Sequence, residues 1–349
     1  EDFLRSLPKA ELHLHLEGSI SPDTILELEP SVTREEVLAR YRYDTFPGFL
    51  DAYKWVNHFL RTPADYALVT RRLLHALAGQ GVLYAEINLS IGVLLWRNHF
   101  LRTPADYALV TRRLLHALAG QGVLYAEINL SIGVLLWRNQ PFHPIFDAIE
   151  AAAAEGPIPV RFIFDAVRQF GLEPASKVAR LAAQCRHRGV IGFGIGGDET
   201  RGPAEIFHDI FAFARDAGLH ILPHAGEADG PKSIWAALEG GAARIGHGIR
   251  AIDDPLLVQH LRDHQIPLDI SISSNICTGV VDRLENHPVR RLFDAGVPIT
   301  LNTDDPPMFH TTLLDEYQLA HTHFGFSREE LRQLARNSLN FALDYRPAA

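Results

Sequence analysis

An exact internal repeat constrains the fold of this chain more than any other feature. Residues 58–98 recur letter for letter as residues 99–139. Repeats in solenoid proteins drift in sequence and occur at least in threes, so two identical copies of 41 residues indicate a recent or accidental duplication. Each copy contains a helix-length amphipathic segment and an apolar run. We predict that one copy is superfluous, so that one completes the domain and the other is extruded or misplaced.

Apolar runs of strand length alternate with helix-length segments along the chain, which is the pattern of parallel βα units. With one copy counted, eight such runs occur, at residues 11–16, 82–90 (or its copy 123–131), 160–167, 190–195, 219–224, 243–247, 267–273 and 297–303. Eight parallel strands close a barrel, whereas both copies together would supply nine. We therefore predict an α/β fold, a (β/α)8 TIM barrel formed as a single domain by residues 1–349, with inserted helices after the first strand.

Local signals mark the ends of two helices in this pattern. Pro203 begins a segment with an apolar stripe, and Gly218 ends it. Ser327 and Glu330 have the spacing of a capping box, which predicts the start of the last helix.

The composition excludes several classes of function. A formal charge of -9 leaves no basic stripe for a nucleic acid backbone. No run of about 18 apolar residues and no apolar leader occurs, so we expect a cytoplasmic protein without a membrane partner. The two cysteines, Cys185 and Cys277, form no CxxC pair, so any metal must be held by imidazole and carboxylate groups.

Titratable residues gather at the carboxyl ends of the predicted strands, where βα barrels build active sites. They are His13 and His15 in the first strand, His224 and Glu227 after the fifth, His247 after the sixth, and Asp304 and Asp305 after the eighth. Alone, an HxH pair is more often structural, and a DD pair before proline is usually a turn. Four such elements in successive strands are better explained by one metal ion with a bound water.

The motifs ELHLHLEGS, PHAGE, RIGHG and LNTDDP resemble the ordered signature of the adenosine deaminase family of amidohydrolases. The resemblance extends from residue 9 to about residue 345, less one copy of the repeat. It implies one zinc ion as cofactor. The ligands that it implies are His13, His15, His224 and Asp304.

The same resemblance assigns roles in catalysis and substrate binding. Glu227 would donate a proton to the purine ring, and His247 would orient the attacking water and help to deprotonate it. Asp305 would hydrogen-bond the imidazole part of the purine and the water. The backbone of Gly197 would meet ring nitrogen 3, and Glu17 would face the 5′ end of the ribose.

Elementary chemistry agrees with these roles. Zinc with one open position lowers the pKa of a bound water toward about 7. Attack at carbon 6 of the purine requires protonation of the adjacent ring nitrogen, which suits a carboxylic acid kept neutral by burial. Two-metal amidohydrolases use a modified lysine on a middle strand. Because no lysine lies inside a predicted strand, we expect one metal.

The family resemblance predicts hydrolytic deamination of the adenosine-to-inosine type, with release of ammonia and a small purine nucleoside as substrate. Two departures leave alternatives open: Glu17 stands where adenosine-specific relatives often have Asp, and SISSN at 271–275 replaces CPxSN. The alternatives are 6-amino-6-deoxyfutalosine deaminase of menaquinone synthesis, whose substrate carries a carboxylate, and adenine deaminase. Arg168, or the copies Arg97 and Arg138, are candidates to pair with that carboxylate. A non-catalytic scaffold, or a chain inactivated by its duplication, is the alternative of a different class.

Overall fold

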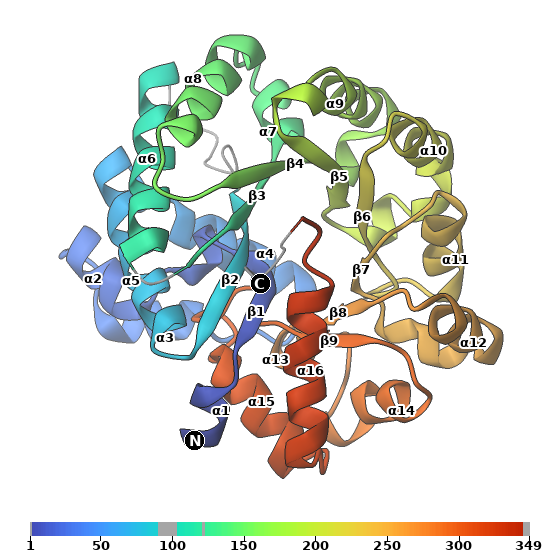
Figure 1. Ribbon diagram of the computed structural model, residues 1–349. Helices are drawn as coiled ribbons and strands as arrows, with labels where there is room; N and C mark the ends of the chain where they lie inside the picture. Colours follow the sequence, from blue (N-terminus) through green and yellow to red (C-terminus); the bar gives the residue numbers. More distant parts are fainter. Residues whose placement is uncertain (1, 90–102, 121–122, 345–349) are drawn as a thin grey trace.

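Nine parallel strands form one sheet in a computed structural model that describes residues 2–89, 103–120 and 123–344. The strands lie in the order of the sequence, each beside the next, and helices surround them (Figure 1). They are β1 (Lys9–His15), β2 (Val82–Leu89), β3 (Ala126–Leu130), β4 (Val160–Val167), β5 (Val190–Gly196), β6 (His220–Ala225), β7 (Ile245–His247), β8 (Leu268–Ile270) and β9 (Ile299–Leu301). The predicted α/β barrel is confirmed, but it has nine strands rather than eight.

The two copies of the repeat lie side by side in the ring, and the expectation that one is extruded is wrong. β2 pairs with β3 so that identical residues oppose one another, from Ala85 with Ala126 to Leu89 with Leu130. A shift of one residue would turn every side chain to the other face of the sheet, whereas this register keeps each apolar residue on the same face as its copy. Each copy therefore supplies a helix and a strand, and the barrel takes up both.

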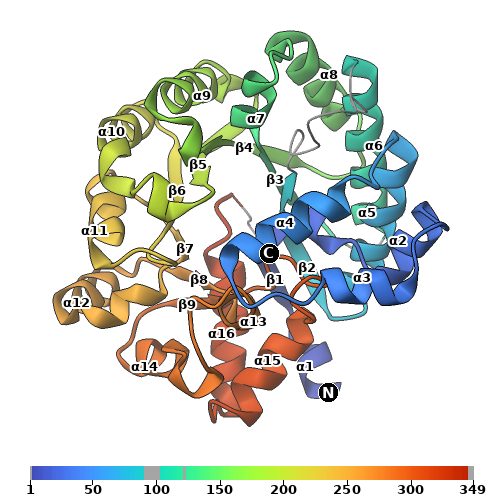
Figure 2. The same ribbon diagram turned by 180° about the vertical axis from the view of Figure 1, so that it is seen from behind.

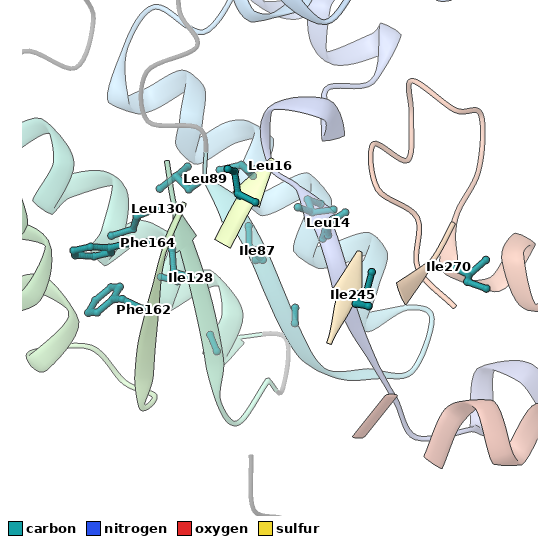
Figure 3. Packing of buried hydrophobic residues seen from close by; sticks show 14 of the residues in the cluster. Leu14, Leu16, Ile87, Leu89, Ile128, Leu130, Phe162, Phe164, Ile245 and Ile270 are labelled. Carbon is teal, nitrogen blue, oxygen red and sulfur yellow. The ribbon is translucent and has the colours of Figure 1, made fainter. Parts of the chain in front are cut away.

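Apolar side chains of the strands form the layer between the sheet and the helices. Ile87 and Leu89 of β2 and their copies Ile128 and Leu130 of β3 are buried there, beside Phe162 and Phe164 of β4 (Figure 3). This alternation is typical of a sheet that buries one set of side chains under helices and turns the other set toward the barrel axis.

The alternate residues of the duplicated strands face the interior of the barrel. Glu86 of β2 pairs with Arg244, which precedes β7 on the far side of the ring, and Arg244 Nε also lies 2.7 Å from Asp269. The copy of Glu86, Glu127, instead accepts hydrogen bonds from the backbone N–H of Asp344 at 3.1 Å and from a tyrosine hydroxyl. The duplication thus places a second acid in the interior, and the arginine pairs with the first.

The barrel is nearly closed between β9 and β1. The Asp304 backbone N–H donates to the carbonyl of His13 at 2.9 Å, and the His15 N–H donates to the carbonyl of Asp304 at 2.8 Å. Lower in this seam the Leu12 N–H donates to the side chain of Asn302 at 2.8 Å. The backbone contacts therefore lie at the carboxyl end of β1, where the candidate site is.

Sixteen α-helices occur among the described residues. They are α1 (Asp2–Ser6), α2 (Pro22–Leu28), α3 (Arg34–Arg40), α4 (Phe46–Asn57), α5 (Pro63–Ala78), α6 (Pro104–Gly120), α7 (Ile132–Trp137), α8 (Phe142–Ala154), α9 (Leu172–Gln184), α10 (His208–Asp216), α11 (Pro231–Glu239), α12 (Pro255–His264), α13 (Ile272–Cys277), α14 (Val289–Asp294), α15 (Leu313–Thr322) and α16 (Arg328–Asn340). None of them is long and apolar enough to cross a membrane.

The predicted helix signals agree with most of these bounds. The inserted helices after the first strand are α2, α3 and α4, and α4 lies in front of β1 and β2 in the view from behind (Figure 2). Ser327 and Glu330 form the predicted capping box of α16. The helix predicted from Pro203 differs, because a 3-10 turn at Ala204–Phe207 precedes α10, which begins at His208.

Candidate functional site

The strand ends bring the predicted ligands together at one place. His13 Nε2 and His224 Nε2 are 3.1 Å apart, and Asp304 Oδ1 lies 3.7 Å from Nε2 of both His13 and His15. One nitrogen from each of the three histidines lies within 4.8 Å of the others, a spacing that can hold a metal ion. These residues come from β1, β6 and the segment after β9, so the fold rather than the sequence order makes them neighbours.

Two of the site residues have an unusual backbone conformation. His247 and Asp304 have positive φ angles of 62° and 64°, a conformation that residues other than glycine rarely adopt. Such strain persists where the surrounding structure enforces it, and it is common at functional sites. Between two of the histidines, Gly246 leaves room, because a Cβ there would lie 3.2 Å from the His13 ring and 3.3 Å from the His224 ring.

The environment of the three histidines favours neutral imidazole rings, the form that binds a metal ion. Burial, reinforced by the neighbouring histidines, lowers the pKa of His13 and His224 well below the usual range, and burial also lowers the pKa of His15. His15 Nε2 is buried and has no hydrogen-bond partner among the described residues. Neutral imidazoles with one carboxylate form the nitrogen and oxygen donor set that zinc accepts, so the residues fit this metal.

Two predicted proton-transfer residues lie beside the donor set. Glu227 Oε2 is 3.8 Å from His247 Nε2, and the same nitrogen is 4.0 Å from Asp304 Oδ2. Burial raises the pKa of Glu227, which favours the protonated form that a proton donor needs. Asp305 is buried, with Oδ1 3.8 Å from His15 Nδ1, and burial and the charge of Asp304 raise its pKa.

The predicted substrate contacts lie around the same strand ends. Gly197 follows β5 with φ of 99°, a conformation that favours glycine, and a Cβ there would lie 2.2 Å from the end of the Gln169 side chain, which would have to move. Glu17 is fully buried in a 3-10 turn (Glu17–Ser19) directly after β1, and α4 packs against this turn.

The role considered for Arg168 is wrong. Its guanidinium donates to the backbone carbonyls of Gly202 and His224, and the residue is only 1% exposed. These bonds occupy the two terminal nitrogens of the guanidinium, so Arg168 fixes the backbone of a candidate ligand rather than facing a substrate carboxylate. Its alternative Arg138 is half-buried at the carboxyl end of α7, and Arg97 lies outside the described residues.

Lys9 also departs from the sequence interpretation, because β1 begins at this residue. Its Nζ donates to the carbonyls of Leu4 and Leu7 at 2.7 and 3.0 Å, before the strand. The lysine therefore lies at the end of β1 opposite to the histidines and cannot bridge two metals.

Sequence reasoning missed a carboxylate that holds the loop carrying Glu227. Glu199, 4% exposed, accepts hydrogen bonds from the Ser233 hydroxyl and from four consecutive backbone N–H groups of residues 226–229, at 2.5 to 3.0 Å. Although burial opposes its ionisation, these hydrogen bonds keep the pKa of Glu199 below its usual value. The signal was present in GGDE, where an acid follows a strand end beside Gly197.

Two hydrogen-bonded residues behind the site were also missed. Ser274, in α13, donates to Asp304 Oδ2 at 2.8 Å, and Asn275 contacts His247 Nδ1 at 3.3 Å. Both belong to SISSN, which was considered only as a departure from CPxSN. The run of polar residues in SISSN, directly after β8, was the sequence signal that could have identified them.

Known proteins agree with this geometry. A parallel βα barrel with histidine and carboxylate groups at its strand ends is the arrangement expected of a metal-dependent hydrolase. Residues 8–95 and 91–345 match the family model described as adenosine deaminase, in two segments that each contain one copy of the repeated strand. The chain belongs to the adenosine deaminase family, and it is a deaminase.

Individual relatives cover nearly the whole chain. It is 37% identical to an aminodeoxyfutalosine deaminase of Streptomyces coelicolor, over 97% of this chain and 80% of the relative. An adenine deaminase of Sinorhizobium medicae is 34% identical, over 96% of this chain and 94% of the relative. The crystal structure of an adenine deaminase from Arthrobacter aurescens superposes with a TM-score of 0.72 at 26% identity, covering 97% and 95% of the two chains.

Proposed function

We propose that this chain removes the 6-amino group of a purine nucleoside by hydrolysis and releases ammonia, using one zinc ion held by His13, His15, His224 and Asp304. The observation that supports this most is the convergence of those ligand atoms beside a buried acid, Glu227. A zinc ion held by these residues would supply a hydroxide nucleophile near neutral pH.

The remaining residues of the site act on the substrate. Burial raises the pKa of Glu227, which suits it to donate a proton to the ring nitrogen next to carbon 6, so that the ring accepts the attacking oxygen without building charge. Asp305 accepts a hydrogen bond from the imidazole part of the purine, and the Gly197 backbone meets ring nitrogen 3. His247 orients the attacking water, since its Nε2 faces both Glu227 and Asp304.

Among nucleosides, we propose the carboxylated 6-amino-6-deoxyfutalosine as the preferred substrate, with adenosine as a weaker one. Two aminodeoxyfutalosine deaminases are 37% and 38% identical to this chain. The longer acid Glu17 at the ribose end suits a changed 5′ group. Because Arg168 is occupied by backbone carbonyls, the proposed partner of the substrate carboxylate is Arg138.

Adenine is the second candidate substrate, favoured by relatives named adenine deaminase at 34% and 36% identity. The free base lacks both the ribose and the carboxylate, so Glu17 and Arg138 would make no contact with it. Substitution of either residue therefore separates the two proposals.

The test measures ultraviolet change and ammonia release with the three compounds in parallel, on zinc-loaded and chelator-treated protein. We expect chelator-sensitive turnover with the highest kcat/KM for the carboxylated nucleoside. Arg138→Ala should raise KM for that compound and leave adenosine unaffected, while Arg180→Ala, on α9, serves as a control. Equal kcat/KM for adenine and the nucleosides would refute the nucleoside assignment, and no turnover by zinc-loaded protein would favour a non-catalytic barrel.

A further inference from the structure

His287 starts a chain of hydrogen bonds that ends at His247. It is 3% exposed, and the backbone N–H of Val289 donates to its Nδ1 at 3.2 Å. A backbone N–H can only donate, so Nδ1 of His287 carries no proton. The ring is therefore neutral, with its proton on Nε2. Burial lowers the pKa of His287 to about 3, in agreement with this state.

The protonated Nε2 of His287 determines the orientation of the next side chain. It lies 3.1 Å from Asn275 Oδ1, to which it must donate. This contact fixes which end of the Asn275 amide is oxygen, an assignment that atom positions alone seldom settle. The amide nitrogen Nδ2 consequently faces His247 Nδ1, at 3.3 Å, and donates to it.

We propose that His287 and Asn275 are positioning residues that hold His247 in the neutral tautomer with its proton on Nε2. Since Nδ1 of His247 accepts from Asn275, the single proton of the neutral ring lies on the nitrogen that faces Glu227 and Asp304. His247 then presents a hydrogen-bond donor to the reaction centre. Its part in the proposed deamination is to orient the attacking oxygen and to stabilise negative charge there.

The relay has a clear structural basis in three elements. Asn275 lies in α13, His287 precedes α14, and His247 ends β7, so residues far apart in sequence build one line of hydrogen bonds. All three side chains are buried, with Asn275 fully so. Bulk water therefore does not replace a missing partner readily, and each group depends on the next for its orientation.

The tautomer can be measured without substrate. In zinc-loaded protein labelled with 15N-histidine, NMR distinguishes a protonated ring nitrogen from an unprotonated one by its chemical shift. The signal of His247 is assigned from the resonance lost in His247→Gln. We expect an unprotonated Nδ1 and a protonated Nε2 in the wild-type chain. A protonated Nδ1 in the neutral His247 ring would overturn the proposal, whether or not the protein deaminates any purine.

Variants test the relay itself. Asn275→Asp replaces the donor with an acceptor, so the proton of His247 should move to Nδ1. His287→Leu removes the donor that orients the Asn275 amide, so the amide can flip. We expect a mixture of His247 tautomers and a kcat reduced about 10- to 100-fold at unchanged KM. His287→Gln retains a donor toward Asn275 and should restore most of the wild-type tautomer and of kcat, whereas His264→Gln, an exposed residue at the end of α12, should change neither. An unchanged His247 tautomer in folded Asn275→Asp would refute the relay.

Discussion

Substitution Glu199→Ala tests whether the loop carrying Glu227 is positioned by a single buried carboxylate. The change removes the acceptor of four backbone N–H groups and of the Ser233 hydroxyl. The hydroxyl can rotate to another partner, and the N–H groups of Ala228 and Asp229 are only partly buried, so water can reach them. The N–H groups of Gly226 and Glu227 are buried and have no such replacement.

The expected size of the effect follows from those two amides. A buried donor left without an acceptor costs about 1–3 kcal/mol, so the free energy of unfolding should fall by about 2–6 kcal/mol. A shift of Glu227 by about 1 Å is expected to lower kcat by about 100-fold, because proton transfer depends on its position. Loss of activity should be larger than loss of zinc, since Arg168 still holds the carbonyl of His224.

The assay combines urea unfolding, zinc content and kcat for the same preparations. Glu205→Ala, an exposed acid in the neighbouring 3-10 turn, is the matched control and should leave all three unchanged. An unfolding midpoint and a kcat equal to those of the wild-type chain would show that the loop holds its position without Glu199 and that this reasoning is wrong.

Three further predictions concern the metal, the repeat and pH. His224→Ala should lose zinc and all chelator-sensitive activity while circular dichroism remains that of a folded barrel; full zinc content would remove His224 from the ligand set. Deletion of residues 58–98 should give a folded eight-stranded barrel that binds zinc, since the other copy supplies a helix and a strand; an unfolded product would show that the ring needs nine strands. Burial raises the pKa of Asp165, in β4, from 3.8 to about 7, so the folded state holds a proton that the unfolded state releases, and the contribution of Asp165 to stability should fall as pH rises from about 4 to 7. Asp165→Asn should weaken this fall in urea midpoints measured at pH 5 and pH 8, and an equal fall in both proteins would contradict the assignment.

The sequence predicted the strands and the residues at their carboxyl ends well, because both depend on local pattern. Alternating apolar runs mark strands. A titratable side chain such as His13 or Asp304 is unusual at the end of a buried strand unless it has a partner, so these positions indicate a functional site. The parallel barrel then brings such ends together whatever their distance along the chain.

Long-range partners could not be predicted in the same way. Arg168 reads as a free cation after a strand, and only the fold shows that the carbonyls of Gly202 and His224 occupy it. Glu199 accepts hydrogen bonds from backbone N–H groups. Almost every residue has such a group, so no sequence motif identifies the partners of Glu199. The roles of Asn275 and His287 likewise depend on which ring nitrogen faces which amide.

The number of strands was the other point at which local pattern failed, because eight were predicted and the barrel has nine. The position of the repeat explains how the fold can take up both copies. The added helix and strand enter between β1 and β4, whereas His224, His247 and Asp304 lie at β6, β7 and after β9. The contact between Asp304 and β1 remains in place on the other side of the ring. The two copies turn the same side chains toward the barrel interior, because they pair in identical register. The insertion therefore adds a strand to the part of the barrel that lies away from most of the candidate metal ligands. A duplication placed between β6 and β9 would instead separate the candidate ligands by a strand, about 4.8 Å, and that site could not hold one ion.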